Sequence, residues 1–303
     1  MKGVLLVNLG TPAAPTPQAV RSYLAEFLSD PRVVKLPRAL WLPVLHGIVL
    51  RTRPEKSARK YAQIWTPGGS PLAVNTRKQA AALQSLLPDV RVEHAMRYGE
   101  PSIAAALGKL EGCAVTAVPL YPQYSESTTQ SVADKLPSSV RMIRDFHDHP
   151  AYIAALAARV RHHWAQHGRS AVLVLSFHGL PKRGGGAYAQ QCLATASLLR
   201  SELGLGESEC RVTFQSRFGY AQWLQPYTEP TLVALAAAGR KRVAVFCPGF
   251  VADCLETLEE IGITAKEKFL QAGGSELDLV PCLNDSPEWI AALAEIVSAR
   301  SGP

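Results

Sequence analysis

The sequence lacks cysteine pairs at the spacing of a metal site or a redox dithiol. None of its six cysteines forms a C-x-x-C pair, which excludes a zinc ribbon and a thioredoxin-like motif. Several lie inside apolar runs, where a free cysteine behaves as a small hydrophobic residue. Unpaired cysteines suit a reducing compartment, so we expect a cytoplasmic protein. The six are Cys113, Cys192, Cys210, Cys247, Cys254 and Cys282.

Long apolar runs are also missing. No stretch approaches the ~20 apolar residues of a transmembrane helix. The first apolar run, GVLLVNLG (3–10), is too short for a secretory signal and is better interpreted as a strand. The formal net charge of +7 favours anionic partners, but no Lys/Arg block or nucleic-acid motif accompanies it. We therefore expect acidic lipid or carboxylated small molecules as partners, and no nucleic acid.

What the sequence does contain is an alternation of short apolar runs with longer helical patterns. Hydrophobic residues make up 47% of the 303 residues, enough for a substantial core. Apolar strands separated by helices predict parallel sheets covered on both faces. The predicted strands are 3–9, 90–96, 113–120, 140–146, 171–177, 210–216, 242–248 and 276–282, and the clearest helices are 76–87, 101–110, 151–167 and 287–300.

Eight strands would fill one barrel or two four-stranded sheets, and the long helix at 151–167 falls midway along the chain. We therefore predict an α/β protein of two similar Rossmann-like domains, each a four-stranded parallel sheet flanked by helices. The first would span 1–147 and the second 148–286. The last helix, within 287–303, would pack back on the first domain.

Residues 33–53, VVKLPRALWLPVLHGIVLRTR, depart from this alternation. The run is apolar, Pro37 and Pro43 interrupt it, and Arg51 and Arg53 end it. One interpretation is a buried helical insert. The other is an exposed apolar lip with basic flanks, which would touch a membrane surface or close over a flat apolar ligand.

Two polar segments follow predicted strands in the second half. His178 lies in LSFHGLP (175–181), where a buried strand meets a Gly/Pro turn. In DCLETLEE (253–260), a helix starting at Asp253 would place Asp253, Glu256 and Glu260 on one face. Such a row could hold protons or attract a divalent cation, but Asp at a helix start is also an ordinary cap. Since ligands bind beyond the carboxyl ends of parallel strands, His178 and the acidic row predict one site.

Other histidines have metal-like spacing. They occur in HDHP (147–150) and as His163 and His167, one helical turn apart. No third ligand accompanies the helical pair, so we interpret it as part of a solvated helix face.

Seven ordered motifs resemble those of the ferrochelatase family along nearly the full length, in the form found in Gram-negative bacteria. They are LLVNLGTP (5–12), IWTPGGSPL (64–72), MRYGEPSI (96–103), LYPQYSESTT (120–129), LSFHGLP (175–181), FQSRFGYAQWLQPYT (214–228) and CPGFVADCLETLEEI (247–261). The resemblance implies insertion of Fe²⁺ into protoporphyrin IX, with release of two protons, to give protoheme.

The resemblance also implies roles for particular residues. His178 and Glu256 would be the catalytic pair that handles protons and the substrate iron. Asp253 and Glu260 would form an acidic path beyond Glu256. The porphyrin-binding residues would be Leu9, Arg97, Tyr98, Tyr121 and Trp223. The lip at 33–53 would make peripheral contact with the inner face of the membrane.

Departures from the family pattern bear on cofactors and substrate. Leu9 stands where coproporphyrin-using relatives carry Tyr, which favours protoporphyrin. Glu126 stands where animal enzymes have a cluster cysteine, so no permanent cofactor and no [2Fe–2S] cluster is expected. Cys254 replaces a histidine of the animal enzymes, and its thiol could carry protons at neutral pH only if its pKa were lowered.

Two alternatives remain at this point. One is a chelatase for coproporphyrin III or sirohydrochlorin, against which Leu9 and the apolar lip argue. The other is a heme or porphyrin carrier without turnover, which leaves the acidic row without a role. The sequence does not divide the roles of His178 and Glu256.

Overall fold

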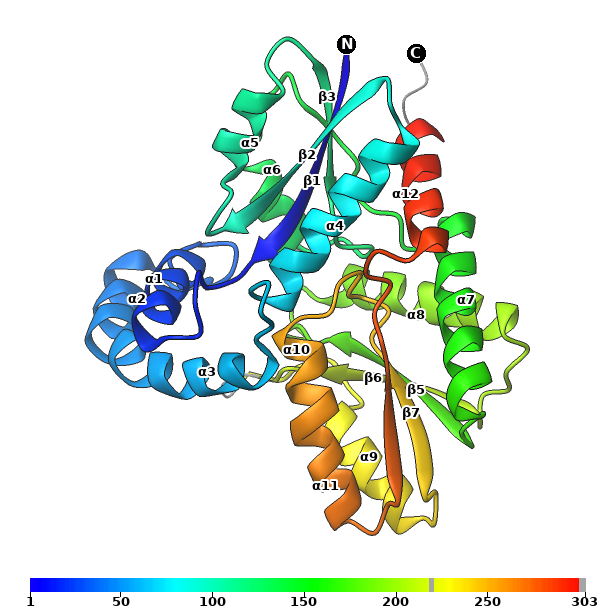
Figure 1. Cartoon of the computed structure of the whole chain (residues 1–303). Helices are drawn as coiled ribbons and strands as arrows, with labels where there is room; N and C mark the ends of the chain where they lie inside the picture. Colours follow the sequence, from blue (N-terminus) through cyan, green and yellow to red (C-terminus); the bar gives the residue numbers. More distant parts are fainter. Residues whose placement is uncertain (218–220, 300–303) are drawn as a thin grey trace. The chain divides into compact units, whose positions relative to one another are not determined.

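The computed structural model describes residues 1–217 and 221–299, and it separates into two units. The first comprises residues 1–145 with the chain from Val297 onward, and the second comprises Phe146–Ile296. Each unit contains one four-stranded parallel sheet, with strand orders β2-β1-β3-β4 and β6-β5-β7-β8 (Figure 1). The two orders are equivalent, which confirms the prediction of two similar α/β halves.

The first unit begins with its central strand. Leu5, Val7 and Ala117 of the sheet are fully buried against α5, as expected for strands covered on both faces. The elements are β1 (Lys2–Gly10), α1 (Pro17–Leu28), α2 (Arg38–Val44), π-helical turn η1 (Leu45–Val49), α3 (Leu50–Ile64), α4 (Pro71–Leu86), β2 (Val90–Tyr98), α5 (Ile103–Lys109), β3 (Ala114–Pro119), π-helical turn η2 (Glu126–Gln130), α6 (Ser131–Ala133) and β4 (Arg141–Met142).

The second unit repeats this plan, with α9 and α11 packed on one face of its sheet. Val174, Val245 and Phe269 lie in that core with no exposed surface. The elements are α7 (Pro150–His167), β5 (Val172–His178), α8 (Gly186–Glu202), β6 (Cys210–Gln215), α9 (Thr228–Ala237), β7 (Arg242–Phe246), α10 (Leu255–Leu258), π-helical turn η3 (Glu260–Ala265), α11 (Lys266–Gln271), β8 (Glu276–Val280) and α12 (Pro287–Ala299).

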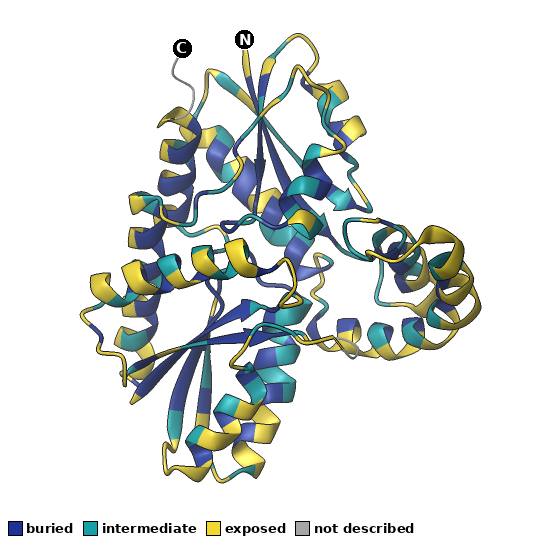
Figure 2. Ribbon diagram, turned by 180° about the vertical axis from the view of Figure 1, so that it is seen from behind, coloured by how far each residue is buried: buried dark blue, intermediate teal, exposed yellow. Residues whose placement is uncertain are grey.

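Three of the differences between observed and predicted element boundaries bear on the sheets and the site. The strand expected over 140–146 is only Arg141–Met142, because β3 offers it just Thr116 and Ala117 as partners. Helix α4 begins at Pro71, where proline suits the first helical turn, and not at 76. His178 is the last residue of β5 instead of following it. The inner strands of both sheets, β1 and β3 and β5 and β7, are nonetheless buried along most of their length (Figure 2).

Most of α12 belongs to the second unit. There the ring of Trp289 lies 5.8 Å from that of Phe146 and 6.0 Å from that of Tyr152. Residues 300–303 of the predicted C-terminal segment lie outside the described residues. The packing of this helix on the first unit stays a prediction.

The segment 33–53 forms α2, η1 and the start of α3, and it is amphipathic. Leu45 and Leu50 are buried, whereas Leu36, Leu40, Val44 and Ile48 are 55%, 70%, 40% and 60% exposed. Leu40, Val44 and Ile48 recur every fourth residue along α2 and η1, and Leu36 lies just before α2; we call these four exposed side chains the lip stripe. The interpretation as an exposed apolar lip therefore holds for this face. No helix within residues 1–217 and 221–299 is long and apolar enough to cross a membrane.

Candidate active site

His178 lies at the carboxyl edge of the second sheet. In the order β6-β5-β7-β8, β6 lies on one side of β5, and the later strands β7 and β8 lie on the other side. The strand order therefore reverses at β5, and open parallel sheets bind ligands at such switch points. Nδ1 of His178 is 2.7 Å from the carbonyl oxygen of Gly179. Since a carbonyl oxygen can only accept, Nδ1 donates to it, and in the neutral imidazole the lone pair is then on Nε2. The ring therefore offers Nε2 to a proton or a metal ion.

The loop after His178 lies against the segment that carries Trp223. Pro181 and Trp223 form a short antiparallel bridge, and the Leu224 N–H donates to the carbonyl oxygen of Leu180 at 2.9 Å. The structure thus places Trp223 beside the loop that begins at His178, as a shared site requires. Residues 218–220, which belong to the same predicted motif, lie outside the described residues.

Glu256 lies in the first turn of α10 and is half-buried. Its backbone carbonyl accepts a hydrogen bond of 2.6 Å from Nε2 of Gln215. Gln215 is the residue paired with His178 in the register of β5 and β6. The turn that carries Glu256 is therefore tied to the strand end beside His178.

Glu260 is bound by the residue that follows Gln215. The backbone N–H of Ser216 donates to Oε1 of Glu260 at 2.7 Å, and the Ser216 hydroxyl donates to Oε2 at 2.6 Å. Burial raises the pKa of Glu260, and the charge of Glu256 adds to this, although the Ser216 bonds and the charge of His178 oppose it. Glu260 therefore interacts electrostatically with both members of the predicted catalytic pair.

Asp253 has a different environment. Its carboxylate accepts hydrogen bonds from the Thr257 hydroxyl at 3.1 Å, the Cys282 N–H at 3.2 Å and Nδ2 of Asn284 at 2.7 Å. These bonds fasten the turn before α10 to the segment after β8. A place for Asp253 on an acidic path stays a prediction.

The expected single acidic helix face is wrong. Cys254, not Asp253, caps the helix, and α10 ends at Leu258. From Glu260 the chain continues as a π-helical turn, whose wider winding breaks the spacing of 3.6 residues per turn.

Cys254 lies directly beside Glu256. Burial raises the pKa of its thiol, and the charge of the Glu256 carboxylate, to which the thiol is hydrogen-bonded, raises it further. The thiol therefore keeps its proton at neutral pH and does not carry protons in place of the histidine of animal enzymes.

In the first unit, Arg97 and Tyr98 belong to a buried network around Asp30. Nη2 of Arg97 lies 2.6 Å from Oδ2 of Asp30, and the Tyr98 hydroxyl donates to the same oxygen at 2.8 Å. The Ser131 hydroxyl donates to it as well, at 2.6 Å. The side chain of Arg97 is only 8% exposed, so its guanidinium is committed to holding this structure together.

Leu9 and Tyr121 come from the ends of neighbouring strands, β1 and β3, where the order β2-β1-β3-β4 has its own switch point. The Tyr121 hydroxyl is buried and finds no hydrogen-bond partner in the described part of the chain. Burial raises its pKa. An unpartnered hydroxyl costs about 1–3 kcal/mol, which a ligand acceptor would recover.

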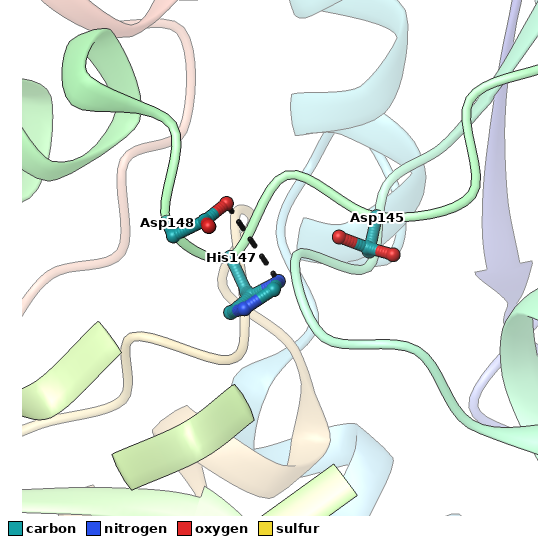
Figure 3. A group of neighbouring side chains, drawn as sticks. All are labelled: Asp145, His147 and Asp148. Atoms are coloured by element: carbon teal, nitrogen blue, oxygen red, sulfur yellow. Dashed lines mark ion pairs between the residues drawn. The ribbon is translucent and has the colours of Figure 1, made fainter. Parts of the chain in front are cut away.

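A separate group of possible metal ligands follows β4. Ligand atoms of Asp145, His147 and Asp148 lie within 4.8 Å of one another, and Nδ1 of His147 is 3.9 Å from Oδ1 of Asp148 (Figure 3). The three are close because they are nearly consecutive, and Asp148 is exposed. The expectation of a solvated helix face is wrong for His163, which is buried and stacked on His167.

Three contributors to these sites escaped the sequence reasoning. Gln215 and Ser216 stand in a polar strand-end segment, which indicated a site but gave them no role. Asp30 follows α1, for which no helix was predicted, and no motif surrounds it. Knowing that Arg97 is buried would have indicated a carboxylate partner, but a single sequence does not show which arginines are buried.

Solved structures of similar fold define the class. CbiX, described as the terminal enzyme of siroheme biosynthesis in denitrifying bacteria, matches with a TM-score of 0.56 and 16% identity over 99% of this chain and all of that one. SirB from Bacillus subtilis matches with a TM-score of 0.56 and 14% identity over 100% of this chain and 96% of that one. The chain has the two-sheet chelatase fold.

The sequence comparisons define the family. A model of the ferrochelatase family matches residues 1–301. Ferrochelatases of Aromatoleum aromaticum, Polaromonas sp. and Azoarcus sp. are 54%, 56% and 55% identical, over 98–99% of this chain and 86–88% of theirs. The chain belongs to the ferrochelatase family, and the resemblance found from its motifs is confirmed. It is a metal-chelating enzyme of heme biosynthesis that inserts Fe²⁺ into protoporphyrin.

Proposed function

We propose that His178 and Glu256 carry out this insertion. The observation that carries the proposal is the tie between them, in which Gln215 is paired in register with His178 and hydrogen-bonded to the backbone of Glu256. The imidazole of His178 and the turn that carries the Glu256 carboxylate are thereby held at the same carboxyl edge of the second sheet. The family resemblance assigns the same two residues.

The reaction needs two proton acceptors and a partly dehydrated metal. Two pyrrole N–H bonds break, four Fe–N bonds form, the iron stays ferrous, and two protons leave. Nε2 of His178 has the lone pair to accept a proton or ligate Fe²⁺. The carboxylates of Glu256 and Glu260 can replace water on the iron and take a proton. Burial, with a smaller contribution from the charge of Glu256, raises the pKa of Glu260 and so favours proton uptake.

For the porphyrin we propose contacts from each unit separately. On the first unit these are Leu9 and Tyr121, the latter supported by its unpartnered buried hydroxyl. On the second unit it is Trp223, a flat apolar surface for a flat ligand. Arg97 and Tyr98 would support the surface on which the porphyrin binds without contacting it through their polar groups, because both side chains are already hydrogen-bonded to Asp30.

We propose that iron is a substrate and that no [2Fe–2S] cluster is held. Glu126 forms an ion pair with Lys35 at the position of a cluster cysteine in animal enzymes. Burial raises the pKa of the thiols of Cys247, Cys254 and Cys282, whereas cluster ligands must be thiolates.

We also propose a cytoplasmic location with peripheral membrane contact through residues 33–53. The lip stripe supplies the apolar surface, and Arg38 and Arg51 are exposed beside it. An amphipathic segment with cationic flanks fits an anionic lipid surface.

The deciding experiment is anaerobic insertion of Fe²⁺ into protoporphyrin IX, followed by porphyrin absorbance. His178→Ala and Glu256→Gln should each slow insertion at least about 100-fold, the scale of a lost general acid or base. His162→Ala and Glu267→Gln, at exposed helix positions in the same unit, serve as matched controls and should retain the wild-type rate.

The same assay separates the alternatives. Faster turnover of coproporphyrin III or sirohydrochlorin would reassign the substrate. A porphyrin spectrum that shifts on binding but never metallates would indicate a carrier. Unchanged rates in both site variants would refute the assignment of His178 and Glu256.

A further inference from the structure

Gln215 is a buried amide with contacts on both sides of the proposed site. It is the last residue of β6 and only 4% exposed. Its backbone carbonyl accepts a 2.8 Å hydrogen bond from the N–H of Gly179, the residue after His178. Its side chain reaches the other way, to the turn that carries Glu256.

The orientation of the amide is determined by its neighbours. Oε1 accepts from the Ser176 hydroxyl at 2.6 Å and from the Cys247 thiol at 3.5 Å. Nε2 donates to the carbonyl oxygen of Glu256 at 2.6 Å and lies 3.5 Å from Oε2 of Glu260. A flipped amide would set its oxygen against a carbonyl and a carboxylate, which repel it. One direction of the amide is therefore strongly preferred.

The supporting residues are themselves buried. Ser176 has no exposed surface, and its hydroxyl lies 2.8 Å from that of Thr228, which is 2% exposed. Polar atoms that are buried and fully paired are rigid, because breaking one bond leaves an unsatisfied group away from water. The amide of Gln215 is thus held both at its oxygen, by Ser176, and at its nitrogen, by the backbone of Glu256.

Ser216 continues this support. It holds a positive φ of 62°, which is costly for a residue with a side chain. In that conformation both its N–H and its hydroxyl point at the carboxylate of Glu260. Two consecutive residues therefore contact two glutamates of the site: Gln215 binds the backbone of Glu256, and Ser216 binds the carboxylate of Glu260.

We propose that Gln215 is a positioning residue that sets the separation between His178 and Glu256 for metal delivery, with Ser216 supporting Glu260. The inference rests on the proposed roles of His178 and Glu256. Moving iron between a carboxylate and an imidazole depends on their separation, and a misplacement of about 1 Å costs on the order of 100-fold in rate. Gln215 joins the strand that carries one group to the turn that carries the other.

The test compares Gln215→Met with Gln84→Met. Methionine keeps the length of the side chain and removes both polar atoms. Gln84 is a matched control, because it is half-buried in the other unit and its amide also binds backbone, with bonds of 2.8 Å to Val90 and 2.9 Å from Val92. Each variant is examined by thermal unfolding, by kcat and the two KM values, and by the visible spectrum of Co²⁺ bound without porphyrin.

We expect Gln215→Met to change kcat or the KM for Fe²⁺ by roughly 10- to 100-fold, with the KM for protoporphyrin within about twofold of wild type. The Co²⁺ bands should shift, because the ligand geometry changes. Gln84→Met should lower only the Tm. If Gln215→Met likewise lowers Tm but leaves kinetics and spectrum unchanged, Gln215 is merely structural and the proposal is wrong.

Two further arms keep the test decisive. If Gln215→Met does not fold, Ser176→Ala replaces it, since that change removes one donor to Oε1 and should move the same readouts less far. The Co²⁺ spectrum also separates the two proposals. If wild type inserts no iron, the proposed function fails, while a spectral shift in the variant still supports positioning by Gln215.

Discussion

At the scale of single residues, Gly179 illustrates how a residue without reactive groups can decide the position of one that has them. A Cβ at Gly179 would lie 2.7 Å from the carbonyl oxygen of Gln215 and 3.3 Å from Cε3 of Trp223. The first contact is with backbone, which cannot rotate away. Only glycine lets the chain leave His178 this close to β6.

Gly179→Ala should therefore destabilise the protein by about 1–3 kcal/mol and slow iron insertion, because the loop after His178 must move. Gly186→Ala is the matched control, since nothing lies within 4 Å of a Cβ there. It begins α8, where alanine should be neutral or stabilise by up to about 1 kcal/mol. Urea unfolding and the insertion assay measure both effects. Equal results for the two variants would contradict the close approach.

At the scale of elements, Asp30 joins three of them in the first unit. It follows α1, and its carboxylate binds Arg97 and Tyr98 at the end of β2 and Ser131 at the start of α6. Burial alone would raise the pKa of Asp30. The hydrogen bonds from Ser131, the Arg32 N–H and Tyr98, with the charge of Arg97, outweigh burial and lower it.

Asp30→Asn should cost about 3–5 kcal/mol, because it leaves the charge of Arg97 buried without its counter-ion. Glu55→Gln breaks the exposed Glu55–Arg59 pair and should cost no more than about 0.5 kcal/mol. Urea unfolding measured across pH tests how this stabilisation depends on the protonation of Asp30. Because the pKa of Asp30 is lower in the folded protein than its ordinary value of 3.8, the ionised carboxylate stabilises the fold above that value. This stabilisation is lost as pH falls through the folded-state pKa. The difference between wild type and Asp30→Asn should stay constant from pH 8 to 5 and shrink only in more acidic solution; a decline that begins near neutral pH would point to another group.

At the scale of the whole molecule, charge and exposed apolar surface favour the same kind of partner. The chain has a formal net charge of +7, and the lip stripe exposes four large apolar side chains. The charge attracts the chain to an anionic surface at long range, while the stripe acts only on contact. The two contributions can therefore be separated by salt.

Binding to vesicles of phosphatidylcholine mixed with phosphatidylglycerol should weaken as salt rises, yet persist in part. Leu40→Ser with Ile48→Ser should reduce binding roughly tenfold or more at any salt concentration. Leu193→Ser with Leu198→Ser is the matched control, because these leucines are 53% and 41% exposed on α8. Sedimentation with vesicles measures both. Equal losses in the two pairs would argue against a specific role of the lip stripe.

The sequence by itself determined the eight strands and their succession along the chain, because alternating apolar runs report burial directly. It also determined the family through seven motifs, and it placed His178 and Glu256 at strand ends in the same half. Parallel strands bring their carboxyl ends together whatever the loops do. These features depend on residues that are close in sequence or on a general rule of the fold.

Only the tertiary structure decided which polar groups hold these residues. Gln215 and Glu256 are 41 positions apart, and Asp30 and Arg97 are 67. Such pairs depend on sheet order and on loop paths, which periodicity does not record. The π-helical turn at Glu260–Ala265 likewise has no signal in spacing, so the acidic row took a different course from the expected helix face. The sequence gives the type of each side chain, but its hydrogen-bond partners depend on how distant segments pack together.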